Sequence, residues 1–308
     1  MIVAKNLCKS FKDGTNEKQV LKNLTFHIAP GECIGLIGKN GAGKTTLLNI
    51  LSGILKPDSG FVRINNCENP LDDFNILRKI SYVSGLNSQL WNDMKLIYSY
   101  ENCMKMYGLS KDDFNNRLSY LTEILDIKEC LHSQVNVLSL GQRIRAELVY
   151  ALLAKPEILF LDEATIGLDV SVKEQIFNML SELKEAKQTT IIYTSHNLNE
   201  VEKICDKLIL LENGEIIYNG TTKKFMHNYA VDSKLVLAID GIFPDLEDLP
   251  LERYQLNNNL LTIDFKKSKI NSVSILRHLL EKTVISNVKI IEPDLESAVK
   301  KIYEGNDL

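Results

Sequence analysis

A glycine-rich stretch near the N-terminus carries the strongest chemical pattern in the sequence. Residues Gly38–Thr46 match the spacing G-x-x-x-x-G-K-S/T of a phosphate-binding loop, and a flexible glycine turn is the alternative. Glycines let the backbone wrap around phosphate oxygens, and the following helix N-terminus favours an anion. We expect Lys44 to contact the β- and γ-phosphates of ATP and the Thr45 hydroxyl to hold Mg²⁺. The other residues expected to bind the nucleotide here are Gly38, Asn40, Gly41, Ala42, Gly43 and Thr46.

Two adjacent carboxylates follow a short apolar run later in the chain. Ile158–Leu161 predicts a buried strand that delivers Asp162 and Glu163 at its C-terminal end. Asp162 would support the Mg²⁺ ion, and Glu163 would act as the general base that polarises the attacking water. An acidic strand end is common, so the functional interpretation depends on the phosphate-binding pattern that accompanies it.

A third pattern distinguishes one family among the many enzymes that share the first two. Leu138–Arg143 (LSLGQR) opens a predicted helix shortly before the acidic strand and resembles the LSGGQ signature of the ABC ATPases. Leu140 stands where that family usually has glycine. The resemblance implies that Ser139, Gly141 and Gln142 bind ATP held by a second chain, with the helix N-terminus aimed at the γ-phosphate. Taken alone, Ser139 would be a helix N-cap and Gln142 a surface amide.

Other positions fit the same resemblance. Phe11 stands where the family has an aromatic that stacks on adenine, and a core phenylalanine is the alternative. Leu168 and Asp169 fit the loop that crosses the dimer interface. Ser195 and His196 follow a predicted strand, and His196 fits the catalytic switch histidine that senses the γ-phosphate.

Three positions depart from the family pattern. Leu140 is one, and Ala164 replaces the usual proline after the catalytic glutamate. The third is the glutamine that couples Mg²⁺ to the membrane subunits: Leu86 stands about where it is expected, and Gln89 follows three residues later. We predict that a remodelled loop brings Gln89 to the metal; the alternative is a protein that lacks this contact. Trp91 would then lie on the permease-facing surface, or else fill a local core.

Composition limits the other classes of function. The chain has 308 residues and a net charge of -4, so no overall basic footprint indicates a nucleic-acid partner. Its six cysteines are scattered without a C-x-x-C pair, which is typical of reduced thiols in a cytoplasmic protein. The longest apolar stretches are too short to cross a bilayer. Any membrane-spanning part must therefore come from other chains.

The pattern of predicted elements indicates an α/β fold with two domains. Strands alternate with helices in residues 1–229, which we expect to form a P-loop NTPase core with a helical subdomain at about 87–155. Residues 230–308 predict a small α+β accessory domain. Predicted strands are Leu24–Ile28, Cys33–Ile37, Phe61–Ile64, Thr190–Thr194, a hairpin of Lys207–Leu211 and Glu215–Tyr218, Leu235–Ile239, Leu260–Phe265 and Val288–Ile291; predicted helices are Thr45–Leu55, Ile270–Glu281 and Leu295–Tyr303.

The resemblance covers nearly the whole chain and is strongest up to about Phe225. The segments SQLWNDM, LSLGQRIRAEL, DEATIGLD and EPDLESAVKKIYEG resemble a bacterial branch of exporter-type ATPases, akin to sodium- and drug-export ATPases. This implies an ATP-hydrolysing subunit, cytoplasmic and peripheral on the inner face of the cell membrane. Its partners would be a second ATPase subunit, identical or different, and separately encoded permease subunits. The alternatives are the ATPase of an importer, an ABC ATPase outside transport, and a non-hydrolysing subunit, against which Lys44, Asp162, Glu163 and His196 argue.

Overall fold

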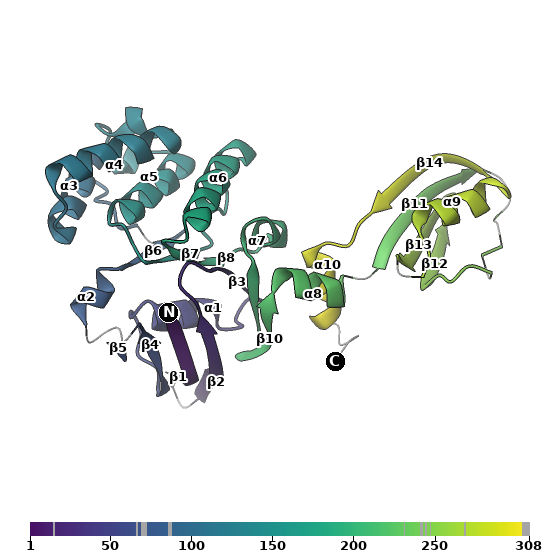
Figure 1. Cartoon of the computed structure of the whole chain (residues 1–308), viewed down its shortest axis with the longest axis horizontal. Coiled ribbons are helices and arrows are strands. Elements are labelled where there is room, and N and C mark those ends of the chain that lie inside the picture. Colours follow the sequence, from purple (N-terminus) through teal and green to yellow (C-terminus); the bar gives the residue numbers. More distant parts are fainter. Residues whose placement is uncertain are drawn as a thin grey trace. The chain divides into compact units, whose positions relative to one another are not determined.

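The chain divides into two units, Met1–Thr221 and Thr222–Leu308, which are described separately below (Figure 1). The computed structural model describes residues 1–14, 16–65, 67–68, 73–85, 88–230, 232–240, 243, 245–246, 248–267 and 269–303. The sequence predicts a boundary after Tyr229, whereas the units meet after Thr221. Helix α8 (Thr222–Tyr229) belongs to the second unit because it packs against α10 (Leu295–Tyr303).

A six-stranded sheet in the order β10-β9-β3-β8-β7-β6 lies at the centre of the first unit. Its strands are parallel except β10, which returns antiparallel to β9 through a turn at Asn213 and Gly214, both with positive φ. Every residue of β7 and β8 is buried, as expected for parallel strands covered on both faces. The strands are β3 (Cys33–Gly38), β6 (Ile80–Ser84), β7 (Ile158–Asp162), β8 (Thr190–Thr194), β9 (Lys207–Glu212) and β10 (Glu215–Thr221).

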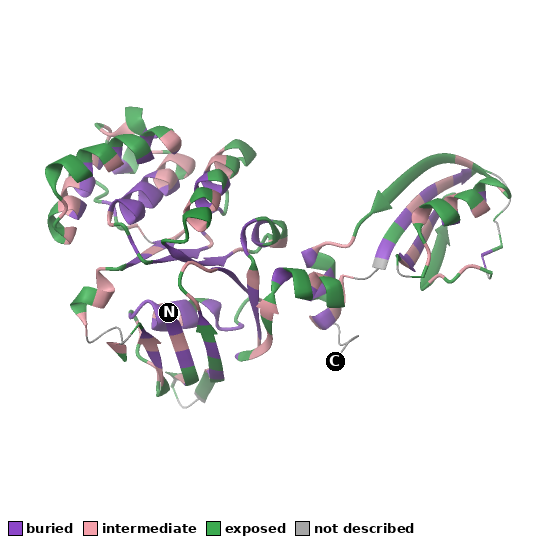
Figure 2. Ribbon diagram, viewed as in Figure 1, coloured by how far each residue is buried: buried purple, intermediate pink, exposed green. Residues whose placement is uncertain are grey.

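A second, antiparallel sheet in the order β2-β1-β4-β5 packs beside the first. One continuous apolar core joins it to α1 and to the central sheet, with Leu7, Leu47 and Phe160 among its fully buried side chains. Figure 2 shows buried positions along the strands of both sheets and along α1. The helix α1 is shorter than the predicted Thr45–Leu55, because Gly53 adopts a left-handed conformation (φ 79) after Ser52. The elements are β1 (Ile2–Asp13), β2 (Asn16–Ile28), β4 (Ser59–Ile64), β5 (Cys67–Glu68) and α1 (Lys44–Leu51).

Helices between β6 and β7 form the predicted helical region. The helix α5 packs against α3, α4 and β6, and α6 packs against α7 (Figure 1). Among the described residues, no helix is both long and apolar enough to cross a membrane, and the six cysteines are reduced. The helices are α2 (Phe74–Leu77), α3 (Leu96–Tyr107), α4 (Lys111–Ile124), η2 (Lys128–Cys130), η3 (Val135–Val137), α5 (Leu140–Leu153), α6 (Val170–Ala186) and α7 (Leu198–Ile204).

The second unit contains a four-stranded antiparallel sheet in the order β12-β13-β11-β14. Alternate residues of β11 and β13, such as Leu237 and Ile263, point into a core closed by Ile275 and Leu279 of α9. The predicted α/β class with a small α+β second part is therefore confirmed. The elements are α8 and α10 as above, β11 (Asp232–Asp240), β12 (Arg253–Asn257), β13 (Leu260–Lys266), α9 (Ser272–Leu280) and β14 (Val284–Ile291).

We expect a chain shortened to residues 1–221 to fold by itself, because both of its sheets and their shared core lie before Thr222. A chain ending at Tyr229 keeps α8 but lacks α10, so it should bind more of an apolar dye and aggregate more readily. Circular dichroism and denaturant unfolding measure the first expectation, and dye fluorescence the second. Loss of cooperative unfolding in residues 1–221 would contradict the division into units.

Candidate functional site

The phosphate-binding loop joins the end of β3 to the start of α1. Gly41 (φ 80) and Gly43 (φ 102) have left-handed backbone conformations that favour glycine. A Cβ on Gly43 would also lie 3.0 Å from the backbone oxygen of Val20. The helix starts without a side-chain cap and without an acidic residue in its first turn. Its first N–H groups therefore form an anion site.

Lys44 is buried inside this loop. Its ammonium donates to the backbone oxygens of Gly38 (2.8 Å) and Lys39 (3.3 Å). Burial lowers the pKa of Lys44, whereas the negative charges of Glu163 and Asp162 raise it. Two of the three ammonium hydrogens are satisfied by the loop, so one donor is available for a phosphate oxygen.

A cavity of about 250 Å³ lies over the loop. Strand β2 contributes Lys18 and Val20, which the sequence analysis did not identify because neither belongs to a spaced motif. Gly38 and Ala42 lie outside its lining: the Gly38 carbonyl holds Lys44, and Ala42 is 4 % exposed. The predicted residues that do line it are Asn40, Gly41, Gly43, Lys44, Thr45, Thr46 and Glu163.

Phe11 lies on β1 at the rim of this region. It is 45 % exposed, so it is not a core residue. It pairs across the ladder with Lys18, which lines the cavity, and the ammonium of Lys9 lies 5.6 Å from the centre of its ring. An exposed aromatic beside a phosphate-binding loop can offer its face to a base.

A larger cavity of about 490 Å³ adjoins the first, and Thr45 and Glu163 line both. Asp162 also lines it; one of its carboxylate oxygens accepts from Thr194 (2.6 Å) and the other from Tyr82 (2.9 Å). Burial raises the pKa of the Tyr82 phenol, and the neighbouring Asp162 raises it further. Tyr82 therefore remains a donor that orients Asp162, a role that no sequence motif indicated.

Glu163 lines both cavities and contacts His196, which lines neither of them. His196 Nε2 lies 2.7 Å from Glu163 Oε1, and both side chains are partly exposed. Glu163 has a left-handed backbone (φ 54), which is costly for a residue with a side chain and is concentrated at functional sites. Its N–H donates to the backbone and side-chain oxygens of Thr194 at 3.2 and 3.1 Å. The end of β8 thus holds Glu163 in its strained conformation.

Gln89 lines the larger cavity together with Thr45 and Asp162. Its backbone N–H donates to the carboxylate of Glu147 on α5 (3.0 Å), and its side-chain amide donates to the backbone oxygen of Tyr82. Glu147 is 4 % exposed; burial raises its pKa, and hydrogen bonds from Ser88 and its neighbours lower it. Leu86 lies outside the described residues. Trp91, two residues after Gln89, is 46 % exposed and does not fill a local core.

The signature residues lie apart from both cavities, whose linings do not include them. Ser139 caps α5 and forms a reciprocal capping box with Gln142. The Gln142 N–H donates to the Ser139 hydroxyl oxygen (3.2 Å), and the Ser139 N–H donates to the side-chain oxygen of Gln142 (2.9 Å). A Cβ on Gly141 would come no closer than 3.8 Å to Leu168. Packing within this chain therefore does not require glycine at 141.

Comparison with known proteins identifies the class to which this arrangement belongs. Residues 21–166 match the family model described as ABC transporter. The linearmycin resistance ATP-binding protein LnrL of Bacillus subtilis is 31% identical over 79% of this chain and 76% of its own length. The methionine import ATP-binding protein MetN 4 of Oceanobacillus iheyensis is 32% identical over 72% of this chain and 66% of its own length.

A solved structure agrees with these relatives. The dimeric post-hydrolysis state of the ATP-binding cassette MJ0796 bound to ADP and Pi superposes with a TM-score of 0.65 and 27% identity, covering 72% of this chain and 98% of that one. The chain therefore belongs to the ABC transporter family, as an ATP-binding subunit.

We expect Glu147→Ala to release the segment that carries Gln89. The change removes the acceptor for the Ser88 hydroxyl and the Gln89 N–H, which should cost about 1–3 kcal/mol of folding free energy. Trp91 is the only tryptophan in the chain, so its quenching by acrylamide reports on this segment alone. Quenching should increase in Glu147→Ala and stay constant in Glu123→Ala, which removes an exposed carboxylate from α4. Equal quenching in both variants would show that Glu147 does not hold the segment.

Proposed function

We propose that this chain hydrolyses MgATP and uses the reaction to drive separately encoded permease subunits. The observation that carries the proposal is the 2.7 Å contact between Glu163 and His196 beside Thr45 and Asp162. A carboxylate held next to an imidazole at the edge of a phosphate-binding cavity is suited to accept a proton from an attacking water.

The residues of the site have separate tasks in this proposal. Lys44 and the N-terminus of α1 balance the charge of the β- and γ-phosphates. Glu163 accepts the proton of the water, and His196 orients Glu163 and contacts the γ-phosphate. Phe11 stacks on the adenine at the exposed end of the cavity. This assignment uses both cavities and accounts for the buried cation at Lys44.

The residues around Asp162 fit a magnesium ion. Mg²⁺ prefers oxygen ligands and usually takes one or two carboxylates together with substrate phosphates. Asp162, the Thr45 hydroxyl and the Gln89 amide supply oxygens at one cavity, and each oxygen of Asp162 retains acceptor capacity beyond its one protein hydrogen bond. When bound, the ion would neutralise charge on the β- and γ-phosphates.

We propose further that two copies, or this chain and a related one, assemble head to tail. Ser139, Gly141 and Gln142 are then directed at ATP held by the other subunit. Support comes from the packing around Gly141, which does not require glycine, from their separation from the chain's own cavities, and from the dimeric state named for MJ0796. Exposed Leu140 at the start of α5 would lie in that interface.

The permease would contact the surface around Trp91. Gln89 faces the larger cavity and Trp91 is exposed two residues later, so one short segment can join the metal site to the outer surface. The protein would accordingly work on the inner face of the cell membrane, next to its permease.

We expect Glu163→Gln to keep ATP binding, to lose turnover by about two to four orders of magnitude, and to accumulate as an ATP-bound dimer. The amide preserves shape and hydrogen bonding but cannot accept the proton. Phosphate release measures turnover, and light scattering measures the dimer. Glu185→Gln is the matched control, because it removes an exposed carboxylate from the C-terminal end of α6. Turnover at the wild-type rate in Glu163→Gln would refute the assignment.

We propose export as the direction of transport. The resemblance to export ATPases and the resistance protein LnrL support it, whereas similarity to the import protein MetN 4 supports the second candidate, import. Inside-out membrane vesicles that contain the chain and its permease should accumulate the substrate when ATP is added outside. ATP-dependent release from such vesicles would instead establish import.

A further inference from the structure

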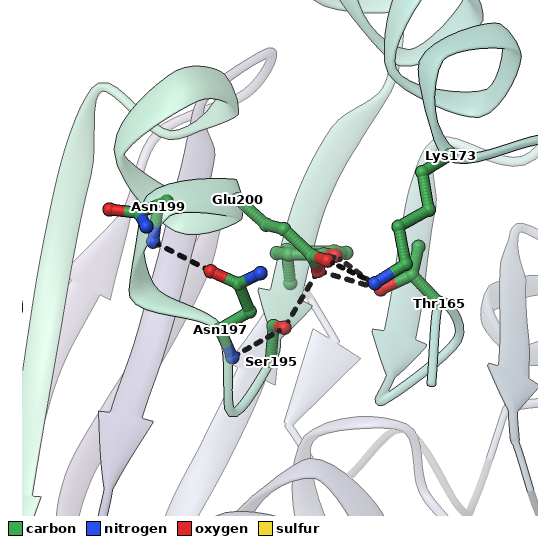
Figure 3. Close-up of polar contacts among 7 residues, drawn as sticks. Thr165, Lys173, Ser195, Asn197, Asn199 and Glu200 are labelled. Atoms are coloured by element: carbon green, nitrogen blue, oxygen red, sulfur yellow. Dashed lines mark hydrogen bonds and ion pairs between the residues drawn. The ribbon is translucent and has the colours of Figure 1, made fainter. Parts of the chain in front are cut away.

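A buried carboxylate outside the expected site lies at the centre of a hydrogen-bond cluster. Glu200 on α7 is 5 % exposed. One of its oxygens accepts from the hydroxyls of Thr165 (2.7 Å), Tyr193 (2.7 Å) and Ser195 (2.8 Å), and the other accepts from the ammonium of Lys173 (2.8 Å) (Figure 3). Such a charge can stay buried because four donors, one of them the Lys173 ammonium, compensate for the loss of water.

Two of the donors lie next to the two residues proposed for hydrolysis. Thr165 follows Glu163 by two positions, and Ser195 directly precedes His196. Figure 3 shows both hydroxyls directed at the Glu200 carboxylate. Glu200 therefore joins the loop after β7 to the loop after β8, across which Glu163 and His196 make their 2.7 Å contact.

Hydrogen bonds fix the loop that carries His196 between this cluster and the start of α7. The Ser195 hydroxyl donates to Glu200 and accepts from the N–H of Asn197 (3.1 Å). The side chain of Asn197 in turn caps α7 by accepting from the N–H of Asn199 (3.1 Å). His196 is thus held on both sides, while its own ring remains at the surface.

The charges in the cluster match one protonation state. Burial raises the pKa of Glu200, but hydrogen bonds from Lys173, Thr165, Tyr193 and Ser195 outweigh it and place the pKa below its ordinary value. Burial raises the pKa of Tyr193, and the charge of Glu200 adds to this increase. Glu200 is ionised and Tyr193 keeps its proton at neutral pH, so Glu200 can accept from all of these donors; the hydroxyls of Thr165 and Tyr193 also lie 2.9 Å from each other.

A small cavity of about 110 Å³ connects the cluster to the reaction site. Its lining includes Glu200 and Lys173 of the cluster together with Glu163 and His196. No residue of the phosphate-binding loop lines it. A disturbance of the cluster would therefore reach the hydrolytic pair without passing through the residues that bind the phosphates.

We propose that Glu200 is a positioning residue that sets the distance between Glu163 and His196. The inference rests on the proposed hydrolytic role of Glu163. Glutamine at 200 would replace one acceptor oxygen by an NH₂ donor that faces other donors, and it would leave Lys173 without its counter-charge. The loops after β7 and β8 would then separate, while the phosphate-binding loop would keep its structure.

The test compares Glu200→Gln with Glu202→Gln, an exposed carboxylate on the same helix. We expect Glu200→Gln to lower kcat by about tenfold to a hundredfold with the dissociation constant for ATP within about twofold of wild type, because a small misplacement mainly affects the chemical step. Glu202→Gln should change neither. A wild-type kcat in folded Glu200→Gln would overturn the proposal.

A second readout does not depend on turnover. Nitrogen-15 spectra of histidine-labelled protein should show a shifted imidazole signal for His196 in Glu200→Gln and an unshifted one in Glu202→Gln. If Glu163→Gln retains turnover, the hydrolytic role fails, yet this signal still tests the positioning. Where Glu200→Gln fails to fold, Ser195→Ala removes only the hydroxyl beside His196 and must shift the same signal. An unmoved His196 signal in the folded variant would reject the positioning role.

Discussion

The parallel register of β3, β8 and β7 is the constraint on which the site depends. Neighbouring parallel strands end at the same edge of a sheet, so whatever follows them is brought together. The strands place Gly38, Asp162 and Thr194 at that edge, and the chain continues from each into a loop. The anion-binding loop, the two carboxylates and the histidine are far apart in sequence and adjacent in space for this reason. The apolar core shared with β1, β2 and α1 keeps the register fixed.

Apolar periodicity in the sequence was sufficient to predict several strands that have at least one buried face. β7 and β8 are apolar runs because both of their faces are covered, and β11 and β13 alternate because only one face is covered. Periodicity did not predict a strand whose side chains are all exposed, because such a strand has no regular apolar positions. All of β12 is exposed, so it has no apolar spacing to detect. The end of α1 depends on the conformation of Gly53, and the start of the second unit depends on the packing of α8. Residue propensities specify neither.

The candidate site likewise contains residues that a sequence motif predicts and residues that only tertiary contacts reveal. Backbone-based chemistry needs glycines at fixed spacing, so Gly38–Thr46 was visible as a motif. Glu147, Glu200 and Tyr82 are single side chains that act by tertiary contact, and their sequence neighbours give no indication of it. Lys18 and Val20 reach the phosphate-binding loop only through strand pairing. Two carboxylates on helices, Glu147 and Glu200, thus support the two ends of the site: one holds the segment of Gln89, and the other holds the loops of Glu163 and His196.

The left-handed backbone of Glu163 has an evolutionary consequence. Holding a residue with a side chain in that region costs on the order of 1–3 kcal/mol, a large fraction of the net stability of a folded domain. Glycine would adopt φ 54 without that cost, and so would be the choice if stability alone were selected. A carboxylate at this position therefore exchanges stability for the proposed activity at a single residue. In this protein a strained backbone and the proposed proton acceptor coincide in one residue, so a substitution that relieved the strain with glycine would also remove the carboxylate.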